Sequence, residues 1–498
     1  MLHYPRSMTE LQHAAKATRP RIQPAEEGDR RPLSVSARLG RLQFHQSGKF
    51  RVLQFADIQD GPKVSKDTIS LIEASLDATR PDLVIFNGNQ IAGYDSAYAL
   101  TFRKRRWDAR PASASSEASG ERYAAALEHT RELVRATIEQ LVHPLADRGV
   151  PWAVTFGNHD FQCGLDNAEI ESICREFPGC INPERAADGT TGIAVKHGVK
   201  HDVKHDVGDM EQDFGLPEQP VIACAPGTFA LSVTDVDRTY GVLGLVLLDS
   251  GDYSRSGGYG SPSEAALRFL ADAPGLMAAQ SQQLQQDRQD EQDSPREPRK
   301  TPSTLPCMVF QHFPIEQYYR LLKPVAATAA RAIEGYRNFA GRHFVLNEDK
   351  TQPGSYLGEG VSCPDADSGE FAILDKAGYF AISAGHDHRN AFVGSVPVGT
   401  DGDRQMMMVA SPTSGFGSYG PVPAKRAARL FEFDIRHPYE PRTQLLEYDE
   451  LVGKPSAGKA YAYGMTSESK PDSEGMDLLH RPTWWSKTWN KLVSLFRR

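Results

Sequence analysis

Five short apolar runs in this chain each end in side chains that can bind a metal ion or carry a proton. These side chains are the carboxylates, amides and imidazoles of Asp57, Gln59, Asn89, Asn158, His159, Asp160, His312, His386 and His388. Such a mixture of oxygen and nitrogen donors suits divalent ions such as Zn, Mn or Fe. If these groups meet at one point, they could activate a water molecule and move a proton during hydrolysis.

The runs that carry these residues have the length and composition of buried strands. They read FRVLQFADIQD (50–60), PDLVIFNGNQ (81–90), PWAVTFGNHD (151–160), PCMVFQHF (306–313) and AGYFAISAGHDH (377–388). Short apolar runs rich in β-branched and aromatic residues favour strands over helices. Because ligands of α/β folds lie beyond the carboxyl ends of the strands, we expect all five strand ends to face one site.

Two segments between the runs have the apolar spacing of amphipathic helices. Residues 71–79 and 128–149 place apolar side chains at positions i, i+3 and i+4, and Gly149 is a plausible end for the second helix. Residues 41–55 are expected to form a β-hairpin that leads into the first strand. This alternation of strands and helices predicts an α/β core with the helices outside.

Composition excludes several classes of protein. The chain has 498 residues, 40% of them hydrophobic, and a formal net charge of −8. Nucleic-acid-binding domains are usually basic, so we expect no nucleic-acid partner. The six cysteines show no CxxC pairing, which argues against a zinc ribbon or a disulfide scaffold. With no secretory signal and no apolar stretch long enough to cross a bilayer, we expect a cytoplasmic protein.

One large domain is predicted between two polar ends. Residues 1–40 are expected to be a mobile arm, 41–450 the domain, and 451–482 a polar linker. Insertions are expected near 110–121, 196–207 and 280–305, where the sequence is Ala/Ser-rich, repetitive, or Gln-rich and charged. In the second, KHGVKHDVKHDV could align three histidines for a metal, although a solvated, low-complexity segment is the simpler interpretation.

The last residues differ in kind from the linker. In TWWSKTWNKLVSLFRR (483–498), a helix would place Trp and Leu opposite Lys and Arg. This amphipathic basic pattern is typical of helices that lie in a membrane interface, and it also suits docking onto a protein. We therefore expect peripheral contact with a membrane surface or with a partner protein through this segment.

The order of the strand-end motifs resembles that of the calcineurin-like metallophosphoesterases. The order is D-x-[H/Q], G-[D/N]-x, G-N-H-[D/E], H and G-H-x-H. Further segments, among them LLDSGDYS (247–254) and SGFGSYG (414–420), look like the intracellular purple-acid-phosphatase-like branch. The resemblance implies a four-layer α/β/β/α sandwich with one or two metal ions at the carboxyl ends of its central strands.

The resemblance also implies a role for each residue. Asp57 and His388 would bind the first ion; Asn158, His312 and His386 would bind the second. His159 would contact phosphate and act as general acid, with Asp160 as the support of its ring. The implied activity is hydrolysis of a phosphoric ester, and the substrate stays open among phosphomonoesters, phosphoproteins, phosphodiesters and nucleotides.

Two residues depart from the family pattern. The family usually has His where this chain has Gln59, and a metal-bridging Asp where it has Asn89. The first metal site thus loses an imidazole and a negative charge, so we expect it to be the weaker one. Two hypotheses remain open: an active phosphoesterase with altered metal binding, and a degenerate phosphate-binding or scaffold module without turnover.

Overall fold

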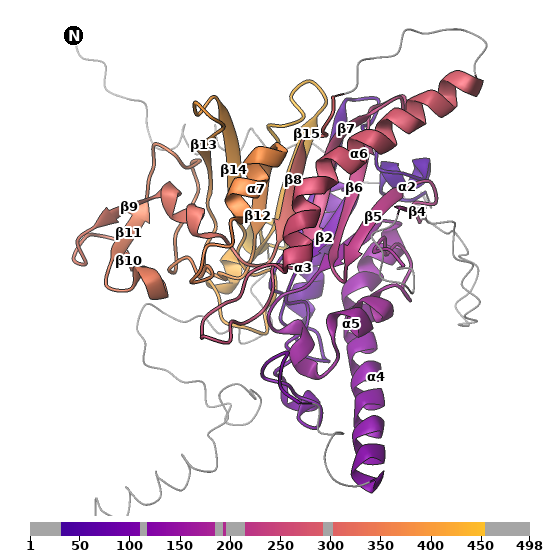
Figure 1. The fold of residues 1–498 in the computed structure, drawn as a ribbon. Coiled ribbons are helices and arrows are strands. Elements are labelled where there is room, and N and C mark those ends of the chain that lie inside the picture. The colour runs from indigo at the N-terminus through magenta and orange to yellow at the C-terminus, as the bar shows by residue number, and fades with distance from the viewer. Residues whose placement is uncertain (1–30, 110–116, 185–192, 196–214, 292–301, 454–498) are drawn as a thin grey trace, which may run out of the picture.

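A computed structural model describes residues 31–109, 117–184, 193–195, 215–291 and 302–453. In these parts of the chain two β-sheets lie face to face between two layers of helices (Figure 1). The predicted four-layer α/β/β/α sandwich is confirmed.

The smaller of the two sheets contains the first three predicted strands. Its order is β16-β15-β1-β2-β3, in which β1, β2 and β3 are parallel and β15 is antiparallel to β1 and β16. The strands are β1 (Lys49–Phe55), β2 (Leu83–Asn87), β3 (Trp152–Thr155), β15 (Ala427–Asp434) and β16 (Arg442–Glu447). Their parallel centre brings the polar ends of the first three runs to one edge.

The larger sheet contains the other two predicted strands. Its order is β13-β14-β12-β8-β7-β6-β5-β4, with β7, β8, β12 and β14 parallel. The strands are β4 (Ile193–Val195), β5 (Pro220–Ala225), β6 (Thr228–Thr234), β7 (Gly241–Leu248), β8 (Cys307–Gln311), β12 (Tyr379–Ala384), β13 (Val393–Val398) and β14 (Arg404–Ala410). A small separate sheet joins β9 (Leu322–Val325), β10 (Ile333–Glu334) and β11 (His343–Leu346).

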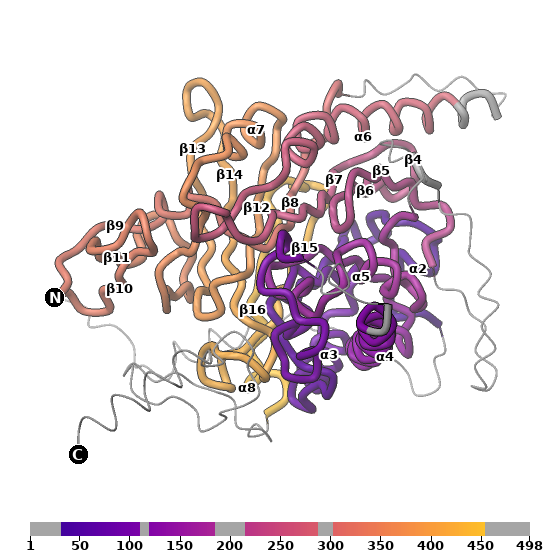
Figure 2. The backbone as a smooth tube through the Cα atoms, turned by 60° about the horizontal axis from the view of Figure 1, so that its bottom comes forward, coloured from indigo at the N-terminus to yellow at the C-terminus, as the bar shows by residue number. Residues whose placement is uncertain are grey.

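Helices cover the outer face of each large sheet. Figure 2 shows α6 and the pair α3 and α4 on opposite sides of the two sheets. The helices are α2 (Val35–Leu39), α3 (Lys66–Thr79), α4 (Glu117–Arg148), α5 (Asn167–Cys174), α6 (Glu264–Glu291), α7 (Glu370–Ala377) and α8 (Tyr448–Leu451). Short 3₁₀ helices span Ser96–Tyr98, Asp160–Cys163, Glu316–Leu321, Arg337–Phe339 and Pro423–Lys425.

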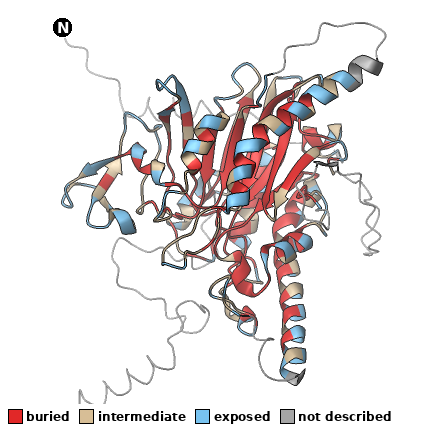
Figure 3. Cartoon of the chain, in the orientation of Figure 1, coloured by how far each residue is buried: buried red, intermediate tan, exposed pale blue. Residues whose placement is uncertain are grey.

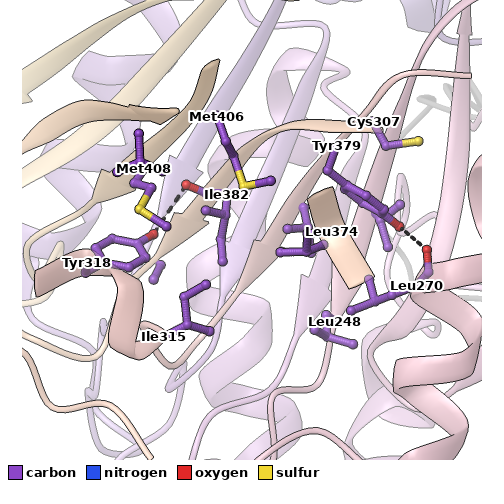
Figure 4. Close-up of a cluster of buried hydrophobic side chains, with 14 of the residues drawn as sticks. Leu248, Leu270, Cys307, Ile315, Tyr318, Leu374, Tyr379, Ile382, Met406 and Met408 are labelled. Carbon is purple, nitrogen blue, oxygen red and sulfur yellow. Dashed lines mark hydrogen bonds between the residues drawn. The ribbon is translucent and has the colours of Figure 1, made fainter. Parts of the chain in front are cut away.

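Apolar side chains fill the spaces between all four layers. The central strands and the inner faces of the helices are buried, whereas the outer helix faces are exposed (Figure 3). Between the sheets, Phe310 of β8 meets Phe431 of β15 edge to face, with ring centroids 5.5 Å apart. On the outer side of the larger sheet, the buried Tyr379 donates a hydrogen bond to the Leu270 carbonyl of α6, so strand and helix are joined there (Figure 4).

The predicted elements are present. All five runs form strands, and both predicted helices are parts of longer ones, α3 and α4. Gly149 follows α4 with φ of 60°, a left-handed conformation that favours glycine and ends the helix. The predicted turn before β1 exists, but Phe44 donates its N–H to the Thr234 carbonyl of the larger sheet rather than extending a hairpin.

One predicted boundary was wrong. The expected arm does not reach residue 40, because Ser34 caps α2 and its hydroxyl hydrogen-bonds the Asp82 carbonyl in the domain. Within the expected insertion 110–121, α4 already begins at Glu117. Residues 280–291, in the third expected insertion, continue α6.

Several predictions concern residues outside the described ranges. The histidine repeat at 196–207 and the amphipathic segment at 483–498 lie there, as does most of the expected linker, and these stay predictions. Within the described ranges, no helix combines the length and the apolar character needed to cross a membrane.

Packing between the two sheets can be tested at Phe310. Because this side chain is fully buried between the sheets, Phe310→Ala should lower the free energy of unfolding by about 3–5 kcal/mol. Urea unfolding of both proteins measures the difference. Leu100→Ala is the control, since Leu100 is 77% exposed, and an equal loss in both variants would contradict the described packing.

Candidate metal centre

The five strand ends meet in one buried cluster. Asp57 follows β1, Asn89 follows β2, Asn158 follows β3, and His312 and His386 follow β8 and β12. The sheets therefore contribute from both sides of the sandwich. Six of the predicted ligands come together here: Asp57, Asn89, Asn158, His312, His386 and His388.

Asp57 lies at the centre of this cluster and is fully buried. Its Oδ2 accepts the backbone N–H of His386 at 2.6 Å, and its Oδ1 lies 3.3 Å from His388 Nε2. A Cβ at Gly385 would come within 2.6 Å of the same Oδ2, so a glycine is needed for this approach. Burial alone would raise the pKa of Asp57, but the neighbouring His312 and His388 lower it well below its usual range.

The Asn89 amide faces three of the other predicted ligands. Its Nδ2 lies 2.9 Å from His312 Nε2, 3.1 Å from Asp57 Oδ1 and 3.2 Å from Asn158 Oδ1. Its Oδ1 faces the opposite way and accepts the backbone N–H of His159 at 2.9 Å. The amide therefore donates toward the cluster and accepts away from it.

Backbone carbonyls fix the tautomers of two histidines. His388 Nδ1 lies 2.7 Å from the Tyr419 carbonyl oxygen, and His312 Nδ1 lies 3.3 Å from that of Asn87. Since a carbonyl oxygen can only accept, each Nδ1 carries the hydrogen in the neutral ring. The Nε2 atoms of both rings are then acceptors that face Asp57 and its neighbours.

His159 borders the cluster, and Gln162 rather than Asp160 holds its ring. His159 Nδ1 lies 2.7 Å from Gln162 Oε1, while Gln162 Nε2 donates to the Lys104 carbonyl at 3.1 Å. The predicted support by Asp160 was therefore wrong. Burial lowers the pKa of His159 to about 4, so the free ring is neutral near pH 7.

The Asp160 carboxylate instead accepts backbone hydrogen bonds from the loops that follow β2 and β3. Its carboxylate accepts the N–H groups of Asn89 at 2.8 Å, Gly157 at 2.7 Å and Ile91 at 3.2 Å. Burial raises the pKa of Asp160 to about 7, against the effect of these backbone donors. Its role is to hold the loops that carry Asn89 and Asn158.

Left-handed backbone conformations concentrate at this site. Asp57, Gln59, Asn89 and His386 have φ of 52°, 45°, 55° and 69°. Each such residue costs about 1–3 kcal/mol, so the surrounding hydrogen bonds must compensate for the strain. Polar residues in strained turns are characteristic of functional sites, although the strain alone names no function.

Gln59 and a set of tyrosines surround the cluster. Gln59 Oε1 accepts a hydrogen bond from the Tyr94 hydroxyl at 3.0 Å, and no described contact joins its side chain to the other ligands. Tyr253 accepts a hydrogen bond from Asn158 Nδ2 at 2.9 Å, and the Tyr259 ring lies 4.3 Å from that of His386. Tyr253 and Tyr259 come from the loop after β7, and Tyr253 lies in the segment LLDSGDYS (247–254), whereas no motif of the sequence pointed to Tyr259.

Three curated proteins are similar to this chain over most of its length, and no family model matches it. Phosphatase DCR2 of Saccharomyces cerevisiae is 22% identical over 73% of this chain and 47% of its own length. Probable inactive purple acid phosphatase 28 of Arabidopsis thaliana is 22% identical over 78% of this chain and 77% of its own. Probable inactive purple acid phosphatase 29 of the same plant is 20% identical over 93% and 92%.

These similarities support a calcineurin-like, purple-acid-phosphatase-like metallophosphoesterase family for this chain. This confirms the resemblance seen in the strand-end motifs. Relatives in this family include a phosphatase and two proteins named as probable inactive ones, so membership leaves turnover open. The chain spans about half the length of the yeast phosphatase.

The cluster offers more acceptors than donors, which fits a cation. Asp57 Oδ1, Asn158 Oδ1 and the Nε2 atoms of His312 and His388 lie together, and the Asn89 amide is the described donor to the first two and to His312. Among the described residues, however, no group of three or more His, Cys, Asp or Glu side chains is placed to hold a metal ion. An ion bound here would therefore need amide oxygens among its ligands.

The corrected roles of Asp160 and Gln162 can be tested by stability. In Asp160→Asn the new amide would turn hydrogens toward backbone donors, so the free energy of unfolding should fall by roughly 2–3 kcal/mol. Gln162→Ala should lower it less, by about 1–2 kcal/mol, because the neutral side-chain bonds to His159 and to the Lys104 carbonyl are lost. Urea unfolding measures both, and the reverse order would restore Asp160 as the partner of His159.

Proposed function

We propose that this chain is a metal-dependent phosphoric-ester hydrolase with fewer metal-binding charges than its family usually has. The observation that supports this proposal most directly is the facing pair of acceptors, Asp57 Oδ1 and His388 Nε2, 3.3 Å apart in a buried site. Two bare acceptors so close repel each other unless a cation or a proton lies between them. The residues for proton transfer lie beside this pair.

Asp57 and His388 would hold a first ion, with Gln59 as a further ligand only if its oxygen leaves Tyr94, and Asn158, His312 and His386 are the remaining candidate ligands. When bound, a divalent ion of the Mn, Zn or Fe type supplies activation of a water nucleophile and neutralises phosphoryl charge. The chain's own residues supply the orientation of the substrate and the proton for the leaving group.

His159 is the proposed proton donor. Its Nε2 lies 3.3 Å from Asn158 Nδ2, at the edge of the cluster, and Gln162 fixes the opposite nitrogen. The negative charge of a bound phosphoester would favour the protonated ring and so oppose the effect of burial on its pKa. Tyr253 and Tyr259 lie over Asn158 and His386, where they limit access of water.

A second candidate function is a degenerate phosphate-binding or scaffold module without turnover. One specific observation favours it: the Asn89 amide donates into atoms that would otherwise be free to bind metal. The two plant relatives carry the words probable inactive in their names. This module would contain no tightly bound ion and would show no metal-dependent activity.

Activity with added metal separates the two functions. Hydrolysis of an aryl phosphate should appear with Mn, Zn or Fe ions, and His159→Ala should lower kcat by about 100-fold or more because the leaving group loses its acid. His386→Ala should also be impaired, whereas Leu100→Ala, at an exposed site, should match the wild type. Absence of turnover with every metal would reject the hydrolase in favour of the module.

A further inference from the structure

We infer that the Asn89 side-chain amide takes the place of one metal ion of the two-ion centre, so that this chain binds a single ion at Asp57 and His388. The inference rests on the proposed metal dependence and specifies it. It differs from the expectation drawn from the sequence, in which the site of Asp57 was the weaker one.

The orientation of the amide is set by the backbone. Asn89 Oδ1 accepts the N–H of His159 at 2.9 Å, and a backbone N–H can only donate. A flipped amide would bring its hydrogens against that N–H and lose the bond. Space is also restricted, since a Cβ at Gly157 would lie 2.2 Å from Asn89 Oδ1. Nδ2 therefore faces the cluster.

An amide nitrogen in this position cannot act as a metal ligand. Nδ2 carries two hydrogens and offers no acceptor site, so it cannot bridge two cations as a carboxylate does. Its hydrogens point at the ligand atoms of His312, Asp57 and Asn158, all within 2.9–3.2 Å. A cation bound to His312 and Asn158 would face the positive end of this amide dipole.

The hydrogens of the Asn89 amide reach the ligand atoms of His312 and Asn158 but not that of His388. Its two hydrogens can serve His312 Nε2 and Asn158 Oδ1, and Asp57 Oδ1 shares them at 3.1 Å. His388 Nε2 receives no hydrogen from Asn89 and faces Asp57 Oδ1 directly. This pair needs either a proton on His388 or a cation between its two acceptors, and the proposed ion takes that place.

Charge leads to the same stoichiometry. Asp57 is the one carboxylate among the described ligands of the cluster, because Asp160 faces the backbone amides behind it. One divalent ion against one buried carboxylate leaves a single excess positive charge. A second ion would raise that excess to three in a site where Asp57 and His312 are fully buried, which is strongly unfavourable.

Metal stoichiometry tests the inference without any measurement of turnover. The full chain is loaded with Mn²⁺ and separated from unbound metal by gel filtration. Its manganese content is then measured by inductively coupled plasma mass spectrometry. Wild type should hold about one ion per chain, and Asn89→Asp about two, since a carboxylate there can join both sites. Asn347→Asp adds the same charge outside the cluster, where Asn347 caps the Asp349 N–H, and should hold about one.

Two ligand variants locate the ion and keep the test valid if Asn89→Asp fails to fold. His388→Ala should weaken Mn²⁺ binding by about 100-fold or more, while His312→Ala should change it by less than about 10-fold. Two ions in the wild type, none after loading, or greater loss in His312→Ala would each overturn the inference. One bound ion without turnover would reject the hydrolase proposal and keep this inference, whereas no bound ion would reject the inference and favour the module without metal.

Discussion

The Asp57 carboxylate connects the two sheets whose strand ends form the site. Asp57 follows β1 of the smaller sheet, and its Oδ2 accepts the backbone N–H of His386, which follows β12 of the larger one. Its own carbonyl accepts a hydrogen bond from Thr413, beyond β14, at 2.6 Å. A single buried residue thus connects loops from both sides of the sandwich, so the strand ends can meet only if the sheets keep their packing.

The strained backbone of the site follows from the same constraint. Polar residues that leave strands at one edge must turn sharply to face each other, and here several do so in left-handed conformations. The Asp160 carboxylate accepts the N–H of Asn89 and the Asp57 carboxylate accepts that of His386, and these bonds hold two of the turns. Protein groups therefore supply the hydrogen bonds that hold these turns.

Much of the fold and the cluster could be predicted from the sequence. Strand length, apolar content and polar ends identified all five strands, and the parallel arrangement explains why Asp57 and His386 meet. The antiparallel strands β4 to β6 were not predicted, since no polar ends mark them. Helix α2 was missed because its attachment through Ser34 to the carbonyl of Asp82 depends on tertiary contact.

Hydrogen-bond roles were harder to predict than positions. Asp160 directly follows His159, yet its carboxylate turns toward backbone N–H groups, a choice that depends on the turn geometry. Gln162, three residues after His159 in the same 3₁₀ turn, is the side chain that reaches the ring. The spacing of three residues was a usable signal, because it brings side chains together in such a turn.

Because the Asn89 amide points its hydrogens at the other candidate ligands, the presence of those ligands does not by itself indicate a bound metal ion. An Asp to Asn difference removes one negative charge and adds two hydrogens, so it supplies part of what a cation would supply. His312 and Asn158 then have hydrogen-bond partners without any metal, and their presence alone is weak support for catalysis. The 3.3 Å contact of His388 with Asp57 receives no hydrogen from Asn89, and either a proton on His388 or a bound cation must account for it, so the case for a metal ion depends on that pair.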